Sequence, residues 1–219
     1  MFGKKKGIAV LTACLLLYMS VHAGERALMQ QKIASEVLRF HVLANSDSEE
    51  DQAVKYQVRD AVLAWLEEEL QVIEEKQEAE FLEKRSDEGR SGVLDGREET
   101  MKLLQGRLAE LEAVADGVLD EAGMAYCASA EVTRCYFPDR TYGSCTFAAG
   151  WYDALRIRLG EAKGQNWWCV LYPRLCFQDC LHAVMEDEQL QELQEVLTVE
   201  EYESLLTQPQ KWKLAFRWF

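Results

Sequence analysis

Apolar and polar residues alternate between residues 36 and 44, in the order Glu-Val-Leu-Arg-Phe-His-Val-Leu-Ala. This period of two, with β-branched and aromatic side chains, predicts a β-strand. Residues 45–48, Asn-Ser-Asp-Ser, end the pattern, and each of their side chains can accept a backbone N–H at a helix start. The acidic residues 49–51 follow, where the helix dipole favours negative charge. The sequence therefore predicts a strand, a short loop and a helix start in succession.

Two long stretches carry apolar residues at helical spacing. The first runs from residue 49 to about 75 and the second from Glu98 to Glu121. Gly123 follows the second stretch, and glycine is the usual residue just beyond a helix C-terminus. Between them, glycines and serines among charged residues predict a flexible loop over residues 84–100. We therefore expect two amphipathic helices joined by this loop.

Strand patterns dominate the second half of the chain. Residues 124–137 have strand propensity, and residues 154–159 alternate aliphatic with arginine side chains. Residues 167–172 are nearly all apolar, which is typical of a central strand. The segment 138–150 predicts a long turn-rich connection, and 160–165 predicts a hairpin-like one.

The C-terminal part adds a helical segment and a last strand. Residues 186–206 have a helical pattern, and residues 211–218 alternate large apolar with mostly basic side chains. The fold expected from all these elements is a single α/β (α+β) domain. In it, a mixed β-sheet packs against the two long helices, and a signal helix precedes the domain.

The N-terminus has the pattern of an export signal. Three lysines at positions 4–6 precede an apolar run over residues 7–19, and Val21 and Ala23 suit a signal peptidase. Residues 1–23 are therefore interpreted as a signal peptide and 24–219 as a single secreted domain. Uncleaved, the signal would serve as an N-terminal anchor, although it is shorter than the roughly 20 apolar residues of a membrane span. A lipoprotein signal ending at Cys14 and a buried N-terminal helix are the alternatives.

Composition and charge exclude some classes of protein. The 219 residues are 48% hydrophobic, which is enough for a packed core and excludes wholesale disorder. They include 24 basic and 38 acidic residues, for a net charge of -14. Cleavage after Ala23 would remove three lysines and make that charge more negative still. Because binding to nucleic acid needs a basic face, a nucleic-acid partner is not expected.

The standard catalytic signals are absent or weak. The patterns G-x-S-x-G, H-E-x-x-H and the P-loop are absent, and only His41 and His182 follow the signal. We therefore expect no enzyme, no cofactor and no small-molecule substrate. A zinc site would use Cys169, Cys176, Cys180 and His182, but their spacing fits no common structural zinc pattern, and no metal is expected.

The cysteines allow several pairings outside the cytoplasm. Cys14 would leave with the signal, so that six of the seven cysteines remain. Cys169 and Cys176 flank a proline turn, and the ends of such a turn can meet within the roughly 4.4–6.8 Å between Cα atoms that a disulfide requires. The remaining thiols could form up to two more bridges or stay free; they are Cys127, Cys135, Cys145 and Cys180.

Two sequence blocks resemble one known family. The first is Leu-Arg-Phe-His-Val-Leu-Ala-Asn-Ser-Asp-Ser over residues 38–48, followed by Asp51-Gln52 and by Val-Arg-Asp-Ala-Val over 58–62. The second is Gly-Gln-Asn-Trp-Trp-Cys-Val-Leu-Tyr-Pro over 164–173, followed by Leu-Cys-Phe. Both blocks resemble stage II sporulation protein R. Only the cysteines at 169 and 176 fall on the family motif, which favours one bridge.

The resemblance implies a signalling protein of endospore-forming bacteria. Such proteins are made in the forespore and exported into the space between the forespore and mother-cell membranes. There they trigger the membrane-embedded aspartic peptidase that removes the pro-segment of sigma factor E. The implied partner is that peptidase, and membrane contact is expected only through it or through an uncleaved signal.

Two hypotheses about the site stay open at this point. One assigns Asn45, Ser46, Asp47, Trp167 and Trp168 to the activating surface, because a loop between a strand end and a helix start is rigid and exposed. In the other, the two blocks only cap and pack the fold. The alternative function is an exported cell-wall protein that binds or hydrolyses peptidoglycan, since the tryptophans Trp151, Trp167 and Trp168 can stack on sugars as well as pack in a core.

Overall fold

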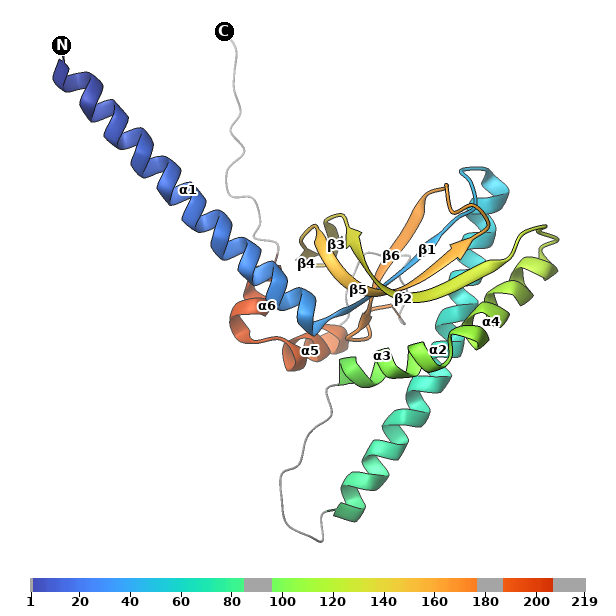
Figure 1. Cartoon of the computed structure of the whole chain (residues 1–219). Coiled ribbons are helices and arrows are strands. Elements are labelled where there is room, and N and C mark those ends of the chain that lie inside the picture. Colours follow the sequence, from blue (N-terminus) through green and yellow to red (C-terminus); the bar gives the residue numbers. More distant parts are fainter. Residues whose placement is uncertain (1, 85–95, 177–186, 207–219) are drawn as a thin grey trace.

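The computed structural model describes residues 2–84, 96–176 and 187–206 (Figure 1). At its centre is a four-stranded sheet in the order β2-β5-β1-β6. Its strands are β1 (Leu38–Leu43), β2 (Ala128–Phe137), β5 (Gly150–Leu159) and β6 (Asn166–Tyr172). β1 runs parallel to β5 and antiparallel to β6, while β2 and β5 are antiparallel. The sheet is therefore mixed, and the expected α+β fold is confirmed.

The position of β1 corrects two predictions. β1 lies between β5 and β6, with Val42 opposite Ile157 on one side and Trp167 on the other. The 160–165 connection therefore crosses β1 and is not a hairpin. β6 is an edge strand of this sheet despite its nearly continuous apolar run, because its side chains are covered on both faces without a second neighbouring strand.

The two long predicted helices agree with the structure except at one break. α2 (Glu49–Lys84) starts where the sequence predicted and is longer. The second predicted helix is divided at Arg107 into α3 (Gly96–Gly106) and α4 (Leu108–Glu121). α3 also takes in the last residues of the expected 84–100 loop, whose residues 85–95 lie outside the described part. An ion pair from Arg107 to Glu69 of α2, at 2.7 Å, holds the break against α2.

The sheet has two covered faces, each with its own core. The face toward α2, α3 and α4 is apolar and centres on Phe40, Val58, Leu111 and Leu155. The opposite face packs on the end of α1 (Phe2–Glu36), on a small hairpin and on two short helices. The hairpin strands are β3 (Arg140–Tyr142) and β4 (Cys145–Phe147), and the helices are α5 (Asp187–Val196) and α6 (Val199–Leu205).

These smaller elements refine what the sequence predicted for two segments. The 138–150 connection contains β3 and β4 rather than turns alone, and they form a separate two-stranded sheet. The 186–206 segment is helical, as predicted, but it divides before Thr198, which caps α6 in a reciprocal pair of hydrogen bonds with Glu201. The predicted last strand over 211–218 lies outside the described residues.

α1 runs without interruption across residue 23 and ends in the core. Ile33 and Ala34 in its last turns are buried against the second face of the sheet, next to Val37. Figure 1 shows its N-terminal part projecting away from the sheet. None of the helices in the described part of the chain combines the length and the apolar character that a bilayer crossing needs.

Candidate functional site

The loop between β1 and α2 is built around one carboxylate, that of Asp51. Asp51 Oδ2 accepts hydrogen bonds from Asn45 Nδ2 at 2.9 Å and from the Ser46 hydroxyl, and Oδ1 accepts one from the Tyr126 hydroxyl. The Asp51 backbone N–H donates to Ser48 Oγ at 3.1 Å. Asp51 is 6% exposed. The loop that the sequence predicted to cap α2 is therefore clamped onto its first turn.

These hydrogen bonds determine the ionisation of Asp51. Burial alone would raise the pKa of this carboxyl, but the hydrogen bonds from Ser46, Tyr126 and Asn45 outweigh it and lower the pKa to about 2. Burial, together with the same contact, raises the Tyr126 pKa well above its usual value. Asp51 is thus a permanent anion near neutral pH, and its charge holds the loop in place.

The loop is also joined to the 160–165 connection, more than a hundred residues later. Asp47 Oδ1 accepts from the Gln165 N–H at 2.8 Å, and Asn45 Oδ1 accepts from the Glu161 N–H at 2.9 Å. The Gly164 N–H donates to the Ala44 carbonyl at 2.9 Å. Gly164 has no room for a side chain, because a Cβ would overlap the Ser46 carbonyl oxygen. The two motif blocks therefore meet at one end of the sheet.

Two cations of α2 lie beneath this junction. Lys55 is 1% exposed, and its Nζ donates to Gln52 Oε1 at 2.6 Å and to the Gln165 carbonyl at 3.2 Å. Burial and the neighbouring Arg59 lower the Lys55 pKa, while Asp47 opposes that shift. The Arg59 guanidinium lies 5.2 Å from the Trp167 ring centroid. Asp47 thus lies close to the positive charges of Lys55 and Arg59.

The predicted site residues divide between the two faces of the sheet. Trp167 is partly buried on the α2 side, edge-on to Phe40 with ring centroids 5.6 Å apart. Trp168 lies on the other face and stacks on His41 at 4.8 Å. The Asn45 and Ser46 side chains bind Asp51, and Asn45 also accepts from the Glu161 N–H, whereas Asp47 is exposed. Among the five predicted residues, Asp47 is therefore the exposed side chain at the junction, and Trp167 lies partly buried beside it.

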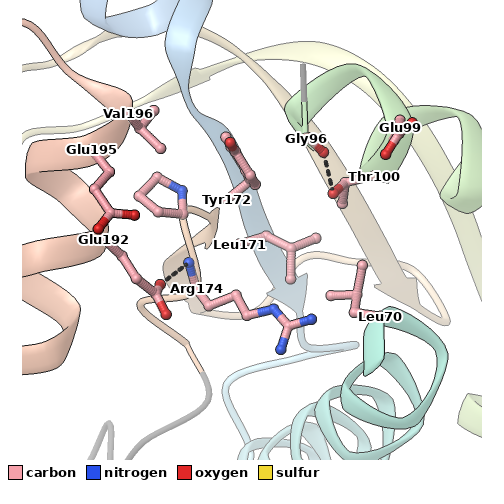
Figure 2. A pocket seen from close by; sticks show the side chains of 11 residues that line it. Leu70, Gly96, Glu99, Thr100, Leu171, Tyr172, Arg174, Glu192, Glu195 and Val196 are labelled. Carbon is pink, nitrogen blue, oxygen red and sulfur yellow. Dashed lines mark hydrogen bonds between the residues drawn. The ribbon is translucent and has the colours of Figure 1, made fainter. Parts of the chain in front are cut away.

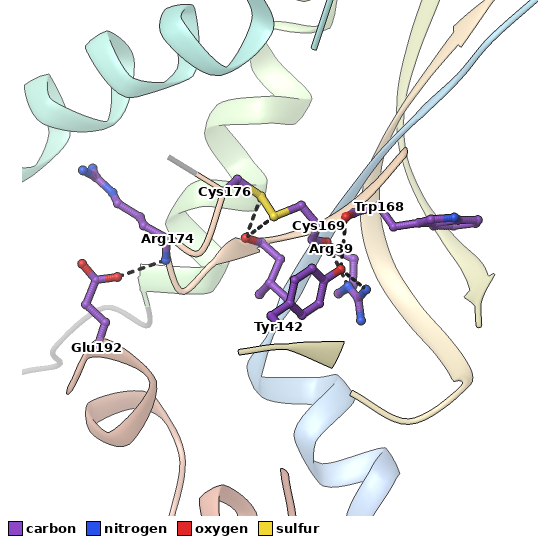
Figure 3. Close-up of a disulfide and its surroundings, with 8 residues drawn as sticks. Arg39, Tyr142, Trp168, Cys169, Arg174, Cys176 and Glu192 are labelled. Carbon is purple, nitrogen blue, oxygen red and sulfur yellow. Dashed lines mark hydrogen bonds between the residues drawn. A yellow bond between two sulfur atoms is a disulfide. The ribbon is translucent and has the colours of Figure 1, made fainter. Parts of the chain in front are cut away.

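A buried arginine, which the sequence did not single out, organises the second face. Arg39 is fully buried, and its Nε donates to the Cys169 carbonyl at 2.9 Å while Nη2 donates to the Tyr142 hydroxyl at 3.1 Å (Figure 3). Its guanidinium carbon lies within 6 Å of four aromatic ring centroids, those of Phe137, Tyr142, Phe147 and Tyr152. Burial lowers the Arg39 pKa. Its position in an alternating strand gave no sign of this role.

His41 and Cys135 touch on this face without forming a reactive pair. Cys135 Sγ lies 3.5 Å from His41 Nε2, and both residues are buried. Burial, with help from Arg156 and Arg39, lowers the His41 pKa to about 3, and burial raises the Cys135 pKa. A thiolate–imidazolium pair needs shifts in the opposite directions. The two side chains therefore act as neutral core residues near pH 7.

The structure joins Cys169 and Cys176 in a disulfide, with 5.8 Å between the Cα atoms (Figure 3). The bridge ties the middle of β6 to the turn after it. Cys135 and Cys145 are buried free thiols and Cys127 is an exposed one, while Cys180 lies outside the described residues. Within the described ranges no group of His, Cys, Asp or Glu is placed to hold a metal ion.

A groove of about 240 Å³ opens beside this turn (Figure 2). It lies between Leu70 of α2, the start of α3, the Tyr172–Arg174 turn and α5. Glu192 of α5 accepts a hydrogen bond from the Arg174 backbone N–H at 3.1 Å. None of the site residues predicted from the sequence lines this groove.

Comparison with known proteins identifies the family. The family model of stage II sporulation protein R matches residues 34–93 and 82–182. The chain belongs to the stage II sporulation protein R family. The curated protein of that name from Bacillus subtilis (strain 168) is 32% identical over 162 residues, which are 71% of this chain and 61% of the relative. No solved structure matches the chain.

The matched range of this sporulation protein includes both blocks that meet at the sheet end. It also includes Arg39, Asp51 and both bridged cysteines. The sequence carried a sign of Asp51, because Asp51-Gln52 is part of the first block. It carried none of Tyr126, whose contact with Asp51 depends on the path of the chain after α4.

Proposed function

We propose that this chain is an exported signal of endospore formation that activates the membrane-embedded aspartic peptidase processing pro-sigma factor E. It acts from the space between the forespore and mother-cell membranes, and it acts by binding rather than by catalysis. Membership of the stage II sporulation protein R family supports the setting.

The observation that carries the proposal is the junction of the two motif blocks. Asp47 receives the Gln165 N–H at 2.8 Å, and the Lys163 and Gly164 N–H groups reach carbonyls of the first block. These hydrogen bonds from backbone N–H groups hold together two segments that are distant in sequence. The two loops therefore lose little conformational entropy when a partner binds them. A rigid, partly exposed loop pair of this kind suits a signal that must fit a receptor.

The neighbourhood of the junction supports binding over chemistry. Asp47 is exposed, while the Lys55 ammonium and the Arg59 guanidinium lie behind it and behind Trp167. Aromatic and arginine side chains are enriched where protein partners bind tightly. The Cys–His contact on the other face is buried and has both pKa values shifted toward the neutral forms, so that it offers no activated nucleophile.

A reconstitution experiment tests the proposal. The full chain, the candidate peptidase and its pro-sigma factor E substrate are produced together in a host that does not sporulate, and processing is followed by immunoblot. Processing should appear only when all three are present. Equal processing without this chain would refute the proposal.

Two substitutions of Asp47 then locate the contact. Asp47→Asn keeps an acceptor for the Gln165 N–H and removes the charge, whereas Asp47→Ala removes both. If Asp47 touches the receptor, both variants should lose at least about tenfold in processing, while their thermal stability differs. The matched control is Asp120→Asn, an exposed carboxylate at the end of α4. Loss in the alanine variant alone would assign Asp47 to holding the loop.

A further inference from the structure

An exposed aromatic pair lies at the far end of the sheet from the junction. In the register of β2 and β5, Arg134 is opposite Asp153 and Tyr136 is opposite Trp151. These four side chains share the face that carries the apolar core, since Val132 and Leu155 on the same strands pack in it. Yet Tyr136 is 54% exposed and Trp151 is 56% exposed.

The covering helices explain this exposure. α4 lies over the other end of β2, where Asp116 and Glu112 accept the backbone N–H groups of Ala128 and Ala130 at 2.6 and 2.8 Å. The sheet continues past the helix layer, and Arg97 at the start of α3 reaches over to pair with Asp153. Trp151 is therefore a surface residue, in contrast to the partly buried Trp167 and Trp168.

A small cavity adjoins the exposed aromatic pair. It has a volume of about 160 Å³ and is lined by Gln31, Ala34, Ser35, Arg97, Arg134, Trp151 and Asp153. The last turns of α1 form one wall, and the two strands with Arg97 form the other. Most of these side chains can donate or accept hydrogen bonds, and Trp151 is the one large apolar surface among them.

We propose that this cavity, the aromatic–arginine pocket, binds one ring of an acidic glycan. A sugar ring has apolar C–H faces and a rim of hydroxyls, which matches an exposed indole surrounded by polar side chains. The Tyr136 and Trp151 rings stand edge-on, with centroids 5.9 Å apart and planes at 78°, so that Tyr136 flanks the indole.

The size and charge of the pocket indicate which glycans it binds. The cavity is smaller than the roughly 300–1,000 Å³ of pockets that enclose whole ligands, so it suits one ring of a longer strand. Arg97 is paired with Asp153, whereas Arg134 is exposed and has no carboxylate partner among the described residues. A carboxylate on the glycan would supply the missing partner, and the arginine fork suits it.

Binding to glycans by the full chain tests this assignment. Isothermal titration calorimetry would use two probes: a disaccharide-peptide fragment of peptidoglycan, which carries carboxylates, and neutral chitotriose. We expect both to bind, the acidic fragment more tightly. Trp151→Ala should weaken both about tenfold, equal to about 1.4 kcal/mol, and Tyr136→Ala should weaken them by less.

Arg134→Gln separates the charge from the stacking. This variant should bind the two probes with similar affinity, because only the acidic fragment gains from Arg134. Tyr56→Ala is the matched control, since Tyr56 is an aromatic residue of α2 that is 43% exposed and lies outside the pocket. Circular dichroism checks that each variant is folded.

Three results would overturn the assignment: no binding of either probe, unchanged binding by Trp151→Ala, or equal loss in Tyr56→Ala. Because the pocket and the Asp47 junction lie at opposite ends of the sheet, pocket variants should still support sigma-factor processing in the three-component host. Failure of the glycan assignment therefore leaves the signalling proposal untouched, and the reverse also holds.

Discussion

The two faces of the central sheet are stabilised by different chemistry, although one strand serves both. β1 directs Leu38, Phe40 and Val42 toward α2 and α4, and it directs Arg39 and His41 toward α1 and the β3–β4 hairpin. The first face is a hydrophobic core whose stabilisation scales with buried area and is insensitive to charge. The second buries a guanidinium and an imidazole.

The second face compensates for this burial without an ion pair. Among the residues that the structure describes, no carboxylate contacts Arg39, which is held by a carbonyl, a hydroxyl and four aromatic rings. Removing a cation from water costs several kcal/mol unless such partners replace its hydration. The comparison teaches that this face depends on particular contacts and on pH, whereas the apolar face depends on packed volume.

Truncation of the two neighbouring β1 residues should give the largest effects. Phe40→Ala and Arg39→Ala should each lower the free energy of unfolding by about 3–5 kcal/mol, because each truncation leaves a cavity. Arg39→Ala also leaves the Cys169 carbonyl and the Tyr142 hydroxyl without their donor. Urea unfolding of the purified variants measures both. Equal tolerance of Arg39→Ala and of a surface change would contradict the role assigned to Arg39.

Arg39→Met then sharpens the distinction between volume and charge. Methionine fills a similar volume among aromatic rings and carries no desolvation cost, so we expect it to recover at least half of the loss in Arg39→Ala. A loss as large as that of the alanine variant would show that the guanidinium hydrogen bonds, rather than filled space, hold this face together.

The next largest effect should be a pH dependence of stability that comes from the polar face, through His41. His41 has an ordinary pKa of 6.5 when unfolded and about 3 when folded, because of burial and the nearby arginines. Below pH 6.5 the unfolded chain therefore binds a proton that the folded chain does not, and stability falls as pH drops toward 3. Between pH 7 and 4.5 this loss should be about 2.5 kcal/mol.

His41→Gln should flatten that part of the profile, because glutamine does not titrate. Asp51 does not interfere in this range, since its folded pKa of about 2 makes its contribution fall only as pH drops below its usual value of about 4. Denaturant unfolding at several pH values gives the measurement. An unchanged slope in His41→Gln would show that another group titrates on folding.

The smallest effect should come from a single hydroxyl on the polar face. The Tyr142 hydroxyl accepts from Arg39 and donates to the Trp168 carbonyl at 3.1 Å. Tyr142→Phe removes both contacts and should cost about 1–2 kcal/mol. Tyr56→Phe on the exposed surface of α2 is the control and should change stability by less than about 0.5 kcal/mol. If Tyr142→Phe and Tyr56→Phe gave the same thermal unfolding curve, the stabilising role assigned to the Tyr142 hydroxyl would be contradicted.

The elements of this fold that were predictable have local signals. The strand over 38–43 and the start of α2 at Glu49 follow from periodicity and from the capping residues between them. The break at Arg107 and the β3–β4 hairpin were missed because both depend on contacts far away, with Glu69 and with the sheet. The edge position of β6 was also missed, because an apolar run does not tell how many strands flank it.

The candidate site divides in the same way. The sequence by itself determined the elements of the first block and the resemblance that the family match confirms, and it offered Cys169 and Cys176 as a candidate pair. Only the tertiary structure decided that Asp47 meets Gln165, that Trp167 and Trp168 separate, that Arg39 is enclosed by aromatic rings and that Trp151 is exposed. The physical reason is that periodicity and capping act between neighbouring residues, whereas burial and pairing depend on which distant segments the sheet brings together.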